Sequence, residues 1–279
     1  MLSLKFKIGR MIPKSIRPAV KFLWFFPFDL AHVITRKNPL HPPPSRIFTG
    51  DGDFIAIGKE VMETLIKDGG LNPSSVVLDI GSGVGRVSLP LVNYLKEGKY
   101  FGGEIVLDAV AWCKRKYKQY PNFKFFHIDA ANSHYNPTGI LNAADYIFPF
   151  HKGSFDLIFL ASVFTHMYED ETRNYLEEIA RLLKPNGKCV ATFFIVTEHA
   201  KTSIQNKTAY YPFIHRINDH TCTATPEDPA ITIAYDQAHL WEMIEKSGLI
   251  ISSAKFGAWS KSENAETHQD TIVLSKAPA

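Results

Sequence analysis

The sequence predicts an α/β protein in which helices cover both faces of an open, mostly parallel β-sheet. Between residues 50 and 196, short runs of β-branched and aromatic residues alternate with helical patterns, as in successive βαβ units. The run Val76–Ile80 is apolar except for Asp79, which is typical of a parallel strand buried on both faces. Right-handed crossovers between such strands give a doubly wound sheet, and a ligand is expected at the carboxyl ends of the strands.

Each element is predicted from its hydrophobic spacing and from the turn residues beside it. Ile57, Val61 and Leu65 share one face of a helix over Ile55–Lys67, and two glycines then end it. The clearest helix, Glu169–Leu183, ends at the turn Lys184–Gly187. The other expected elements are helices at Val84–Lys96, Leu107–Gln119 and Gln237–Lys246 and strands at Tyr100–Glu104, Phe123–Ile128, Phe155–Leu160, Lys188–Val196, Leu249–Phe256 and Thr271–Lys276.

The composition is that of a globular protein. The 279 residues are 45% hydrophobic and 21% charged, which excludes a disordered or fibrous chain. Three cysteines without a CxxC pair indicate reduced thiols and therefore a cytoplasmic location. No apolar run reaches the ~18 residues of a membrane-spanning helix, and the short apolar run Phe22–Phe28 lacks a following signal-peptide cleavage site.

Positive charge is concentrated in an arm, residues 1–46. The arm holds nine Lys and Arg and one acid, Asp29, for a net charge of +8, which leaves −5 for the rest of a chain whose total is +3. It ends in the Pro-rich linker Asn38–Pro44. Its basic and aromatic residues fit three roles: contact of residues 1–30 with the inner face of an anionic membrane, a cover across the domain, or a targeting peptide. Gly9, Pro13 and Pro18 are expected to interrupt any long helix.

Residues 50–279 are expected to form one domain, with a polar, lid-like insert at about residues 197–232. This domain shows no basic stripe, so nucleic acid is not an expected partner. Four residues of the insert are potential metal ligands, but they lack the spacing of a zinc site, and no metal is expected: His215, Asp219, His220 and Cys222.

Three alternating glycines after the strand Val76–Ile80 indicate a ligand site, because they allow positive φ and leave bare backbone at the start of a helix. A dinucleotide fingerprint requires its third glycine where Arg86 stands. The carboxylate of Asp79, two residues before the first glycine, would repel a pyrophosphate and attract a cationic amine or sulfonium. The spacing and the charge therefore both weigh against an NAD(P)-dependent oxidoreductase.

The run Leu78–Gly85 resembles the first motif of class I S-adenosylmethionine (SAM)-dependent methyltransferases, and later landmarks agree over roughly residues 50–279. The resemblance implies a Rossmann-like fold with seven strands, the last antiparallel, and SAM as the cofactor. It also implies that Glu104 binds the ribose hydroxyls and that Asp129 accepts from the adenine amino group. The implied cofactor-binding residues are Asp79, Gly81, Ser82, Gly83, Gly85, Arg86, Glu104, Ile105, Asp129, Ala130 and Ser162.

Four further segments resemble a bacterial-type subgroup of this family whose acceptor is unknown: Gly50–Phe54, Phe148–Phe150, Ser162–His166 and Thr267–Asp270. Methyl transfer from SAM is an in-line displacement, which needs a base only when the nucleophile carries a proton. His166, just past the fourth strand of the parallel series, is the candidate base, although Thr165 or His166 could instead cap the helix that begins at Glu169. Asp145 and Tyr146 are weaker candidates.

The favoured function is methyl transfer to a small molecule or a lipid-linked glycan, with protein next and nucleic acid last. Two alternatives stay open: an NAD(P)-dependent oxidoreductase and a non-catalytic SAM-binding scaffold protein. The sequence does not predict the acceptor, the methylated atom or the oligomeric state.

Overall fold

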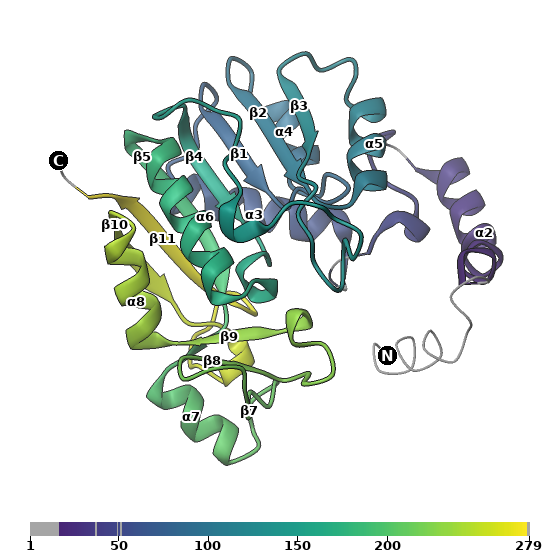
Figure 1. Cartoon of the computed structure of the whole chain (residues 1–279). Coiled ribbons are helices and arrows are strands. Elements are labelled where there is room, and N and C mark those ends of the chain that lie inside the picture. The colour runs from purple at the N-terminus through teal and green to yellow at the C-terminus, as the bar shows by residue number, and fades with distance from the viewer. Residues whose placement is uncertain (1–16, 37, 49, 51, 278–279) are drawn as a thin grey trace.

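The computed structural model describes residues 17–36, 38–48, 50 and 52–277, with side chains described from residue 23 onward. Its centre is a seven-stranded sheet in the order β10-β11-β5-β4-β1-β2-β3 (Figure 1). The strands are β1 (Val76–Ile80), β2 (Lys99–Glu104), β3 (Phe123–His127), β4 (Phe155–Leu160), β5 (Leu183–Phe193), β10 (Leu249–Lys255) and β11 (Asp270–Lys276). Strands β1 to β5 pair in parallel, and β11 is antiparallel to both neighbours. The predicted fold class is confirmed.

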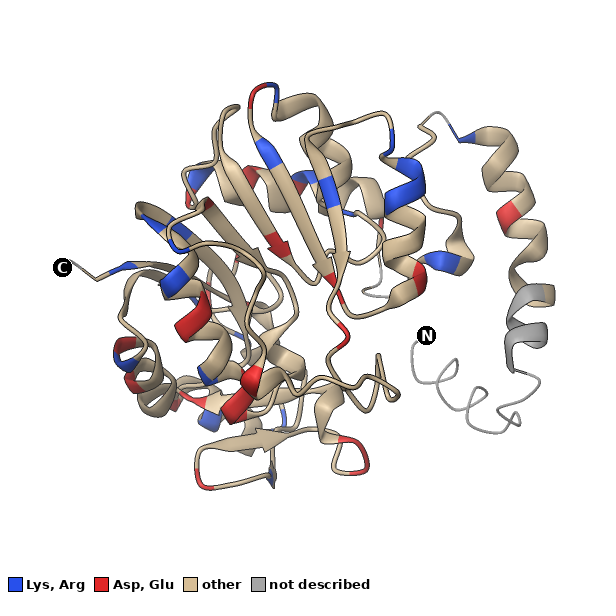
Figure 2. Cartoon of the chain, turned by 45° about the horizontal axis from the view of Figure 1, so that its top comes forward, with Lys and Arg blue, Asp and Glu red and all other residues tan. Residues whose placement is uncertain are grey.

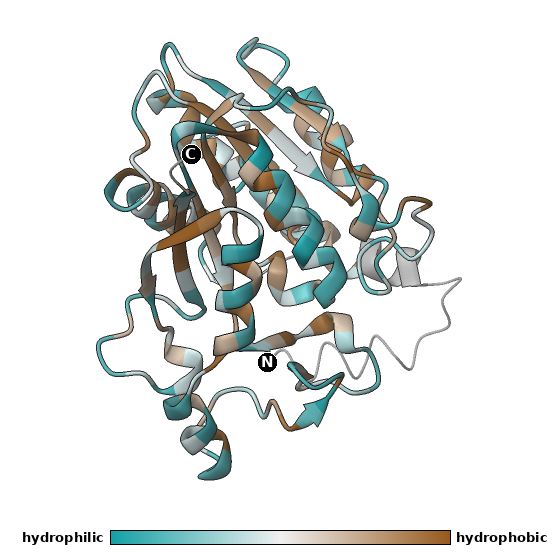
Figure 3. Ribbon diagram, turned by 60° about the vertical axis from the view of Figure 1, so that its left-hand side comes forward, coloured by the Kyte–Doolittle hydropathy of each residue, from teal (hydrophilic) through white to brown (hydrophobic). Residues whose placement is uncertain are grey.

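Helices pack on both faces of this sheet. One face carries α3 (Phe54–Lys67), α4 (Ser88–Tyr94) and α5 (Leu107–Lys116), and the other carries α6 (Glu169–Leu182) and α8 (Gln237–Lys246). Because side chains alternate along a strand, Val77 of β1 packs in the core beneath α3, α4 and α5, and Leu78 packs in the core beneath α6 and α8. Figure 3 shows hydrophobic residues concentrated in the strands and hydrophilic residues on the outer sides of the helices. The chain turns from one half of the sheet to the other at β1, between β2 and β4, which places the switch point there.

The segment after β5 is more ordered than the irregular polar stretch expected from the sequence. It contains α7 (Glu198–Gln205), β7 (His215–Arg216) and β8 (Thr221–Thr223), which join β6 (Ile195–Val196) and β9 (Ile233–Asp236) in a second sheet of order β6-β9-β8-β7. In Figure 1 this small sheet lies beyond the carboxyl ends of β4 and β5. Thr197 caps α7 by accepting from the Ala200 N–H at 3.0 Å.

The expected strand Lys188–Val196 is shifted and divided. Strand β5 begins at Leu183, and its pairing with β4 skips from Leu183 to Lys188, so the turn Lys184–Gly187 forms a bulge within the strand. The Lys184 ammonium is 2.8 Å from the Asp156 carboxylate on β4, which holds this bulge against its neighbour. Phe194 then separates β5 from β6.

A long helix, α2 (Arg17–Thr35), forms in the arm, so the expectation of an interrupted helix is wrong for these residues. Pro18 lies in its first turn, where a missing N–H removes no helical hydrogen bond, and Gly9 and Pro13 lie outside the described residues. The Pro-rich segment packs on the domain: Leu40 is 2% exposed, and the His41 ring stacks on Phe54 at 5.4 Å.

Asp270 at the start of β11 joins the two sheets. One carboxylate oxygen accepts from the N–H of Gly257 at 2.7 Å. The other accepts from the N–H of Ile195 at 2.6 Å and from the indole N–H of Trp259 at 2.8 Å. The side chain is 1% exposed, and burial raises its pKa to about 6.

We expect Asp270→Ala to lower the free energy of unfolding by at least ~3 kcal/mol, because three buried donors lose their acceptor at ~1–3 kcal/mol each. Asp53→Ala is the matched control, since Asp53 makes one exposed bond to the Ala56 N–H as the cap of α3 and its loss costs ~1 kcal/mol. Urea denaturation measures both. Equal losses in the two variants would contradict the structural role of Asp270.

Candidate functional site

The glycine turn between β1 and α4 is attached to the end of β2. The N–H groups of Gly81 and Ser82 donate to the Gly103 carbonyl at 2.8 and 3.0 Å. All three alternating glycines have positive φ. A Cβ at Gly81 would lie 2.4 Å from Val163, and one at Gly85 would lie 2.7 Å from the Ser88 hydroxyl, whereas one at Gly83 would meet nothing within 4 Å. Gly83 therefore borders open space where a ligand can approach the backbone.

Glu104 ends β2 directly beside this turn and is 5% exposed. Its carboxylate accepts from the Gly83 N–H at 2.7 Å and from the Val106 N–H at 2.8 Å. Burial raises the pKa of Glu104, and the backbone N–H groups act in the opposite direction. Each carboxylate oxygen has a second lone pair, so the group retains acceptor capacity for hydroxyls of a ligand. Ile105 follows it, half-buried, and its carbonyl lies 3.0 Å from the His127 ring nitrogen.

Asp79 lies in β1, two residues before the glycine turn begins, and is 2% exposed. The Tyr100 hydroxyl donates to one of its oxygens. Burial raises the pKa of Asp79 to about 8, and the neighbouring charge of Glu104 adds to this effect. The sequence predicts an ionised Asp79, but with a pKa of about 8 its neutral form dominates at pH 7. A cation bound nearby would favour ionisation.

Asp129 follows β3 and completes a row of acids on three neighbouring strands. Glu104 pairs with His127 in the parallel register, which places Asp129 just beyond the same edge of the sheet. One Asp129 oxygen accepts from the Asn136 amide at 3.1 Å, and the same amide donates to the Ala130 carbonyl at 3.0 Å. The structure therefore brings Asp79, Glu104 and Asp129 to the carboxyl ends of β1, β2 and β3, at the switch point of the sheet.

Three other residues expected at the cofactor have different surroundings. Ser162 is exposed, and its hydroxyl donates to the Gln269 side chain at 2.9 Å. Among the interactions of the described residues, none joins Ser162 to Asp79, Glu104 or Asp129. The Arg86 guanidinium lies 3.4 Å from the Gly50 carbonyl and 5.3 Å from the Phe54 ring, so it holds the segment before α3. The Ser82 hydroxyl is buried and has no hydrogen-bond partner within the described part of the chain.

His166 ends the 3₁₀ helix η3 (Phe164–His166) after β4. Its Nδ1 is 2.9 Å from the Ala230 carbonyl. A carbonyl only accepts, so Nδ1 carries the hydrogen and Nε2 presents a lone pair. Burial lowers the pKa of His166, which keeps the ring neutral at pH 7. The capping alternative is wrong, because α6 is capped at Tyr168, whose N–H donates to the Glu171 carboxylate at 2.7 Å.

Sequence reasoning missed Tyr135. Its ring meets the His166 ring edge-on at 5.2 Å and the Phe48 ring at 6.3 Å. Burial, with the charge of Glu104, raises the pKa of the Tyr135 hydroxyl to about 12. Tyr135 thus packs against the candidate base and is close enough to Glu104 for that charge to affect the pKa of its hydroxyl. The only local signal was Asn132, whose side chain accepts from the N–H groups of residues 134 and 135 and folds the loop.

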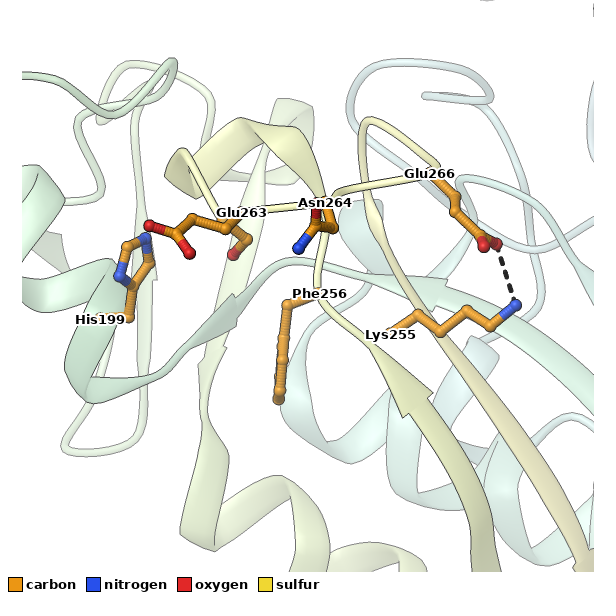
Figure 4. Close-up of a pocket in the computed structure, with 7 residues that line it drawn as sticks. His199, Lys255, Phe256, Glu263, Asn264 and Glu266 are labelled. Atoms are coloured by element: carbon orange, nitrogen blue, oxygen red, sulfur yellow. Dashed lines mark hydrogen bonds and ion pairs between the residues drawn. The ribbon is translucent and has the colours of Figure 1, made fainter.

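A separate pocket lies at the β10 end of the sheet and is lined by His199, Lys255, Phe256, Ser262, Glu263, Asn264 and Glu266 (Figure 4). Lys255 is paired with Asp68 at 2.8 Å and Glu266 at 3.0 Å, so its charge is already neutralised. Within the described ranges no cluster of His, Cys, Asp and Glu is arranged to hold a metal ion, and none of the helices there is long and apolar enough to cross a membrane.

Comparison with known proteins gives a family match for part of the chain. Residues 78–191 match the family model of a methyltransferase domain. Ribosomal RNA small subunit methyltransferase A of Clostridium botulinum is 29% identical over 85 residues. These residues are 30% of this chain and 30% of that protein, so the chain spans less than a third of the length of the curated relatives that it matches.

Solved structures share the fold. A protein of Pyrococcus horikoshii OT3 has a TM-score of 0.56 at 15% identity and covers 84% of this chain and 95% of its own. A SAM-dependent methyltransferase of Clostridium acetobutylicum has a TM-score of 0.51 at 11% identity, covering 82% and 94%. The magnesium protoporphyrin IX methyltransferase of Synechocystis, with bound SAH, has a TM-score of 0.50 at 16% identity, covering 82% and 90%.

We expect the stability of the protein without ligand to fall as the pH rises from about 4 to about 8, in part because of Asp79. Its folded-state pKa of about 8 exceeds the ordinary value of 3.8, so unfolding releases a proton throughout this window. The contribution is complete below the ordinary pKa and is lost by pH 8, with a slope of at most ~1.4 kcal/mol per pH unit. Asp79→Asn should flatten the curve of unfolding free energy against pH.

Asp145→Asn, which changes an exposed acid, is the control and should leave that curve unchanged. Urea denaturation at several pH values measures all three proteins. A slope that is the same in Asp79→Asn as in the unmodified protein would show that Asp79 is ionised in the folded state.

Proposed function

We propose that this chain, whose residues 78–191 match the methyltransferase-domain model, is a class I SAM-dependent methyltransferase and that it methylates a hydroxyl group of a small molecule or a lipid-linked glycan. The observation that carries this proposal is the state of His166, a partly buried histidine whose lowered pKa keeps it neutral at pH 7 and whose Nδ1–H is committed to the Ala230 carbonyl, which leaves the lone pair on Nε2. A base is needed only for a nucleophile that carries a proton at neutral pH, and a hydroxyl is such a nucleophile.

SAM supplies a methyl group that is already activated by the sulfonium centre. The residues described above fit it: Gly83 leaves room against the backbone, and Glu104 and Asp129 present acceptors for hydroxyl and amino groups. The chain's own contribution is then to align donor and acceptor and exclude water. His166 Nε2 takes the proton of the attacking hydroxyl, while the hydrogen bond from Nδ1 to the Ala230 carbonyl fixes the ring orientation.

The surroundings of His166 support an uncharged acceptor. The ring contacts the Tyr135 ring, and the His166 carbonyl accepts from the Asn132 amide. Nearby, His134 is paired with Asp228. One relative is named as a ribosomal RNA methyltransferase, so RNA is an alternative acceptor. Proteins bind RNA mainly through contacts of Lys and Arg with its phosphates. Figure 2 shows Lys and Arg on several segments, among them α5 and the region near α2, and the hydrogen bonds described for His166 include none to a Lys or Arg.

The acceptor can be identified by incubating the protein with methyl-labelled SAM and a cell extract, then separating small molecules, lipid-linked glycans, protein and RNA. We expect the label in the first two fractions. Label confined to RNA or protein would contradict the proposed acceptor. SAM binding without any labelled product would favour a non-catalytic scaffold, and binding of NADH instead of SAM would restore the oxidoreductase alternative.

We expect Gly83→Ala to weaken SAM binding at least tenfold, because the added methyl would occupy the open space over the turn. Gly70→Ala is the matched control: Gly70 also has positive φ and its Cβ would also meet nothing within 4 Å. Both variants should lose a similar ~1–2 kcal/mol of stability. Calorimetric titration with SAM distinguishes them, and unchanged affinity in folded Gly83→Ala would place the cofactor elsewhere.

Once the acceptor is identified, kcat can be measured for its methylation. His166→Ala should reduce this kcat by about 100-fold or more, as is typical of the loss of a general base, while the SAM affinity stays unchanged. In the unmodified protein, kcat should fall as the pH drops below the pKa of His166, and this acidic limb should vanish in the variant. His199→Ala, at the separate pocket, serves as the control. A full kcat in His166→Ala would remove His166 from the mechanism.

A further inference from the structure

Helix α2 exposes large apolar side chains to an extent that is unusual for a folded domain. The exposed fraction is 72% for Leu23, 69% for Trp24, 51% for Phe26, 58% for Phe28, 50% for Leu30, 52% for Val33 and 74% for Ile34. In Figure 1 the helix lies beside α5, away from the central sheet. Contiguous exposed apolar surface of this kind marks an interaction site.

The helix is attached to the domain by its polar side. Asp29 accepts from the Ser45 N–H at 3.0 Å, and the His32 ring nitrogen lies 3.1 Å from the His41 carbonyl. Residues 25, 29, 32 and 36 share one helical stripe, and all four are partly buried. Leu23, Leu30 and Ile34 fall on the opposite side. A surface helix normally buries its apolar stripe and exposes its polar one, so α2 has the reverse arrangement.

Cations crowd next to this helix. Around Trp112 of α5 lie Arg46 at 5.1 Å, Arg115 at 5.4 Å and Lys116 at 4.7 Å from the ring centre. Besides burial, the charges of Arg36 at the end of α2, Arg115 and Arg46 lower the pKa of Lys116. Figure 2 shows the basic segments of α5 and of η1 (Pro44–Arg46) on the side that faces α2. Four cations that repel one another favour an anionic partner.

We propose that α2 and the neighbouring cations Arg46, Arg115 and Lys116 form a docking surface for an anionic phospholipid bilayer. The helix would lie in the headgroup region, with its apolar side toward the acyl chains and the cations on lipid phosphates. A second copy of the chain is a poorer occupant, since two-fold pairing would bring two arms of net charge +8 together. This surface is independent of the acceptor proposed above.

The test is co-sedimentation of the full chain with vesicles of phosphatidylcholine alone or with about 30% phosphatidylglycerol. We expect binding to the anionic vesicles, at least tenfold weaker binding to the neutral ones, and weakening by salt. Leu30→Glu with Ile34→Glu should reduce binding at least tenfold. Ile147→Glu with Ile214→Glu is the matched control, because these residues are 73% and 63% exposed on other segments.

Neutralising two cations with Arg115→Gln and Lys116→Gln should weaken binding and flatten its dependence on salt. Unchanged SAM affinity shows that each variant is folded. Equal binding of the unmodified protein to neutral and anionic vesicles would overturn the proposal. Equal binding of the Leu30→Glu, Ile34→Glu variant and of its control to anionic vesicles would do the same. So would a protein that binds no vesicles but forms a dimer that Leu30→Glu with Ile34→Glu dissociates, because α2 would then be a contact between copies.

Discussion

The parallel pairing of β1 with β2 is the constraint on which the site depends. Ile80 at the end of β1 is in register with Gly103 of β2, so the chain leaves β1 beside a carbonyl that is free to accept two N–H groups of the turn. The same register brings Glu104 within 2.7 Å of the Gly83 N–H. A shift of one residue would reverse the direction of each side chain and remove Glu104 from the turn. Backbone pairing in the core therefore determines the geometry at the surface.

Burying two acidic side chains beside the glycine turn costs folding free energy, and the packing of the fold does not require it. Asp79 and Glu104 are both almost fully buried, and the charge of Glu104 contributes to the raised pKa of Asp79. Two acids in a low-dielectric site disfavour each other's ionisation. Packing alone would be served better by apolar residues, and perturbed acids at a sheet switch point are typical of a binding site. The Tyr100 hydroxyl satisfies Asp79 without supplying a charge.

Sequence reasoning located the elements whose determinants are local. Strands β1 and β4 and helix α8 have the expected bounds, since their apolar runs and flanking turns lie within each segment. Helix α4 begins at Ser88 instead of Val84, because the glycine turn continues through an N–H···O bond from Gly85 to Ser82. Tyr135, Asp270 and the small sheet depend on partners distant in sequence, such as Ile195 for Asp270, 75 residues away. Periodicity carries no information about such pairs.

The arm and the glycine turn are connected through a short series of contacts. His32 of α2 meets His41 edge-on at 4.5 Å, the His41 ring stacks on Phe54, and the Arg86 guanidinium lies over the Phe54 ring at 5.3 Å. Arg86 directly follows the glycine turn. A bilayer that holds α2 would therefore also hold the turn at a defined distance from the lipid surface. For a lipid-linked acceptor, confinement to the same surface would raise the effective concentration of substrate at the site without any new contact to it.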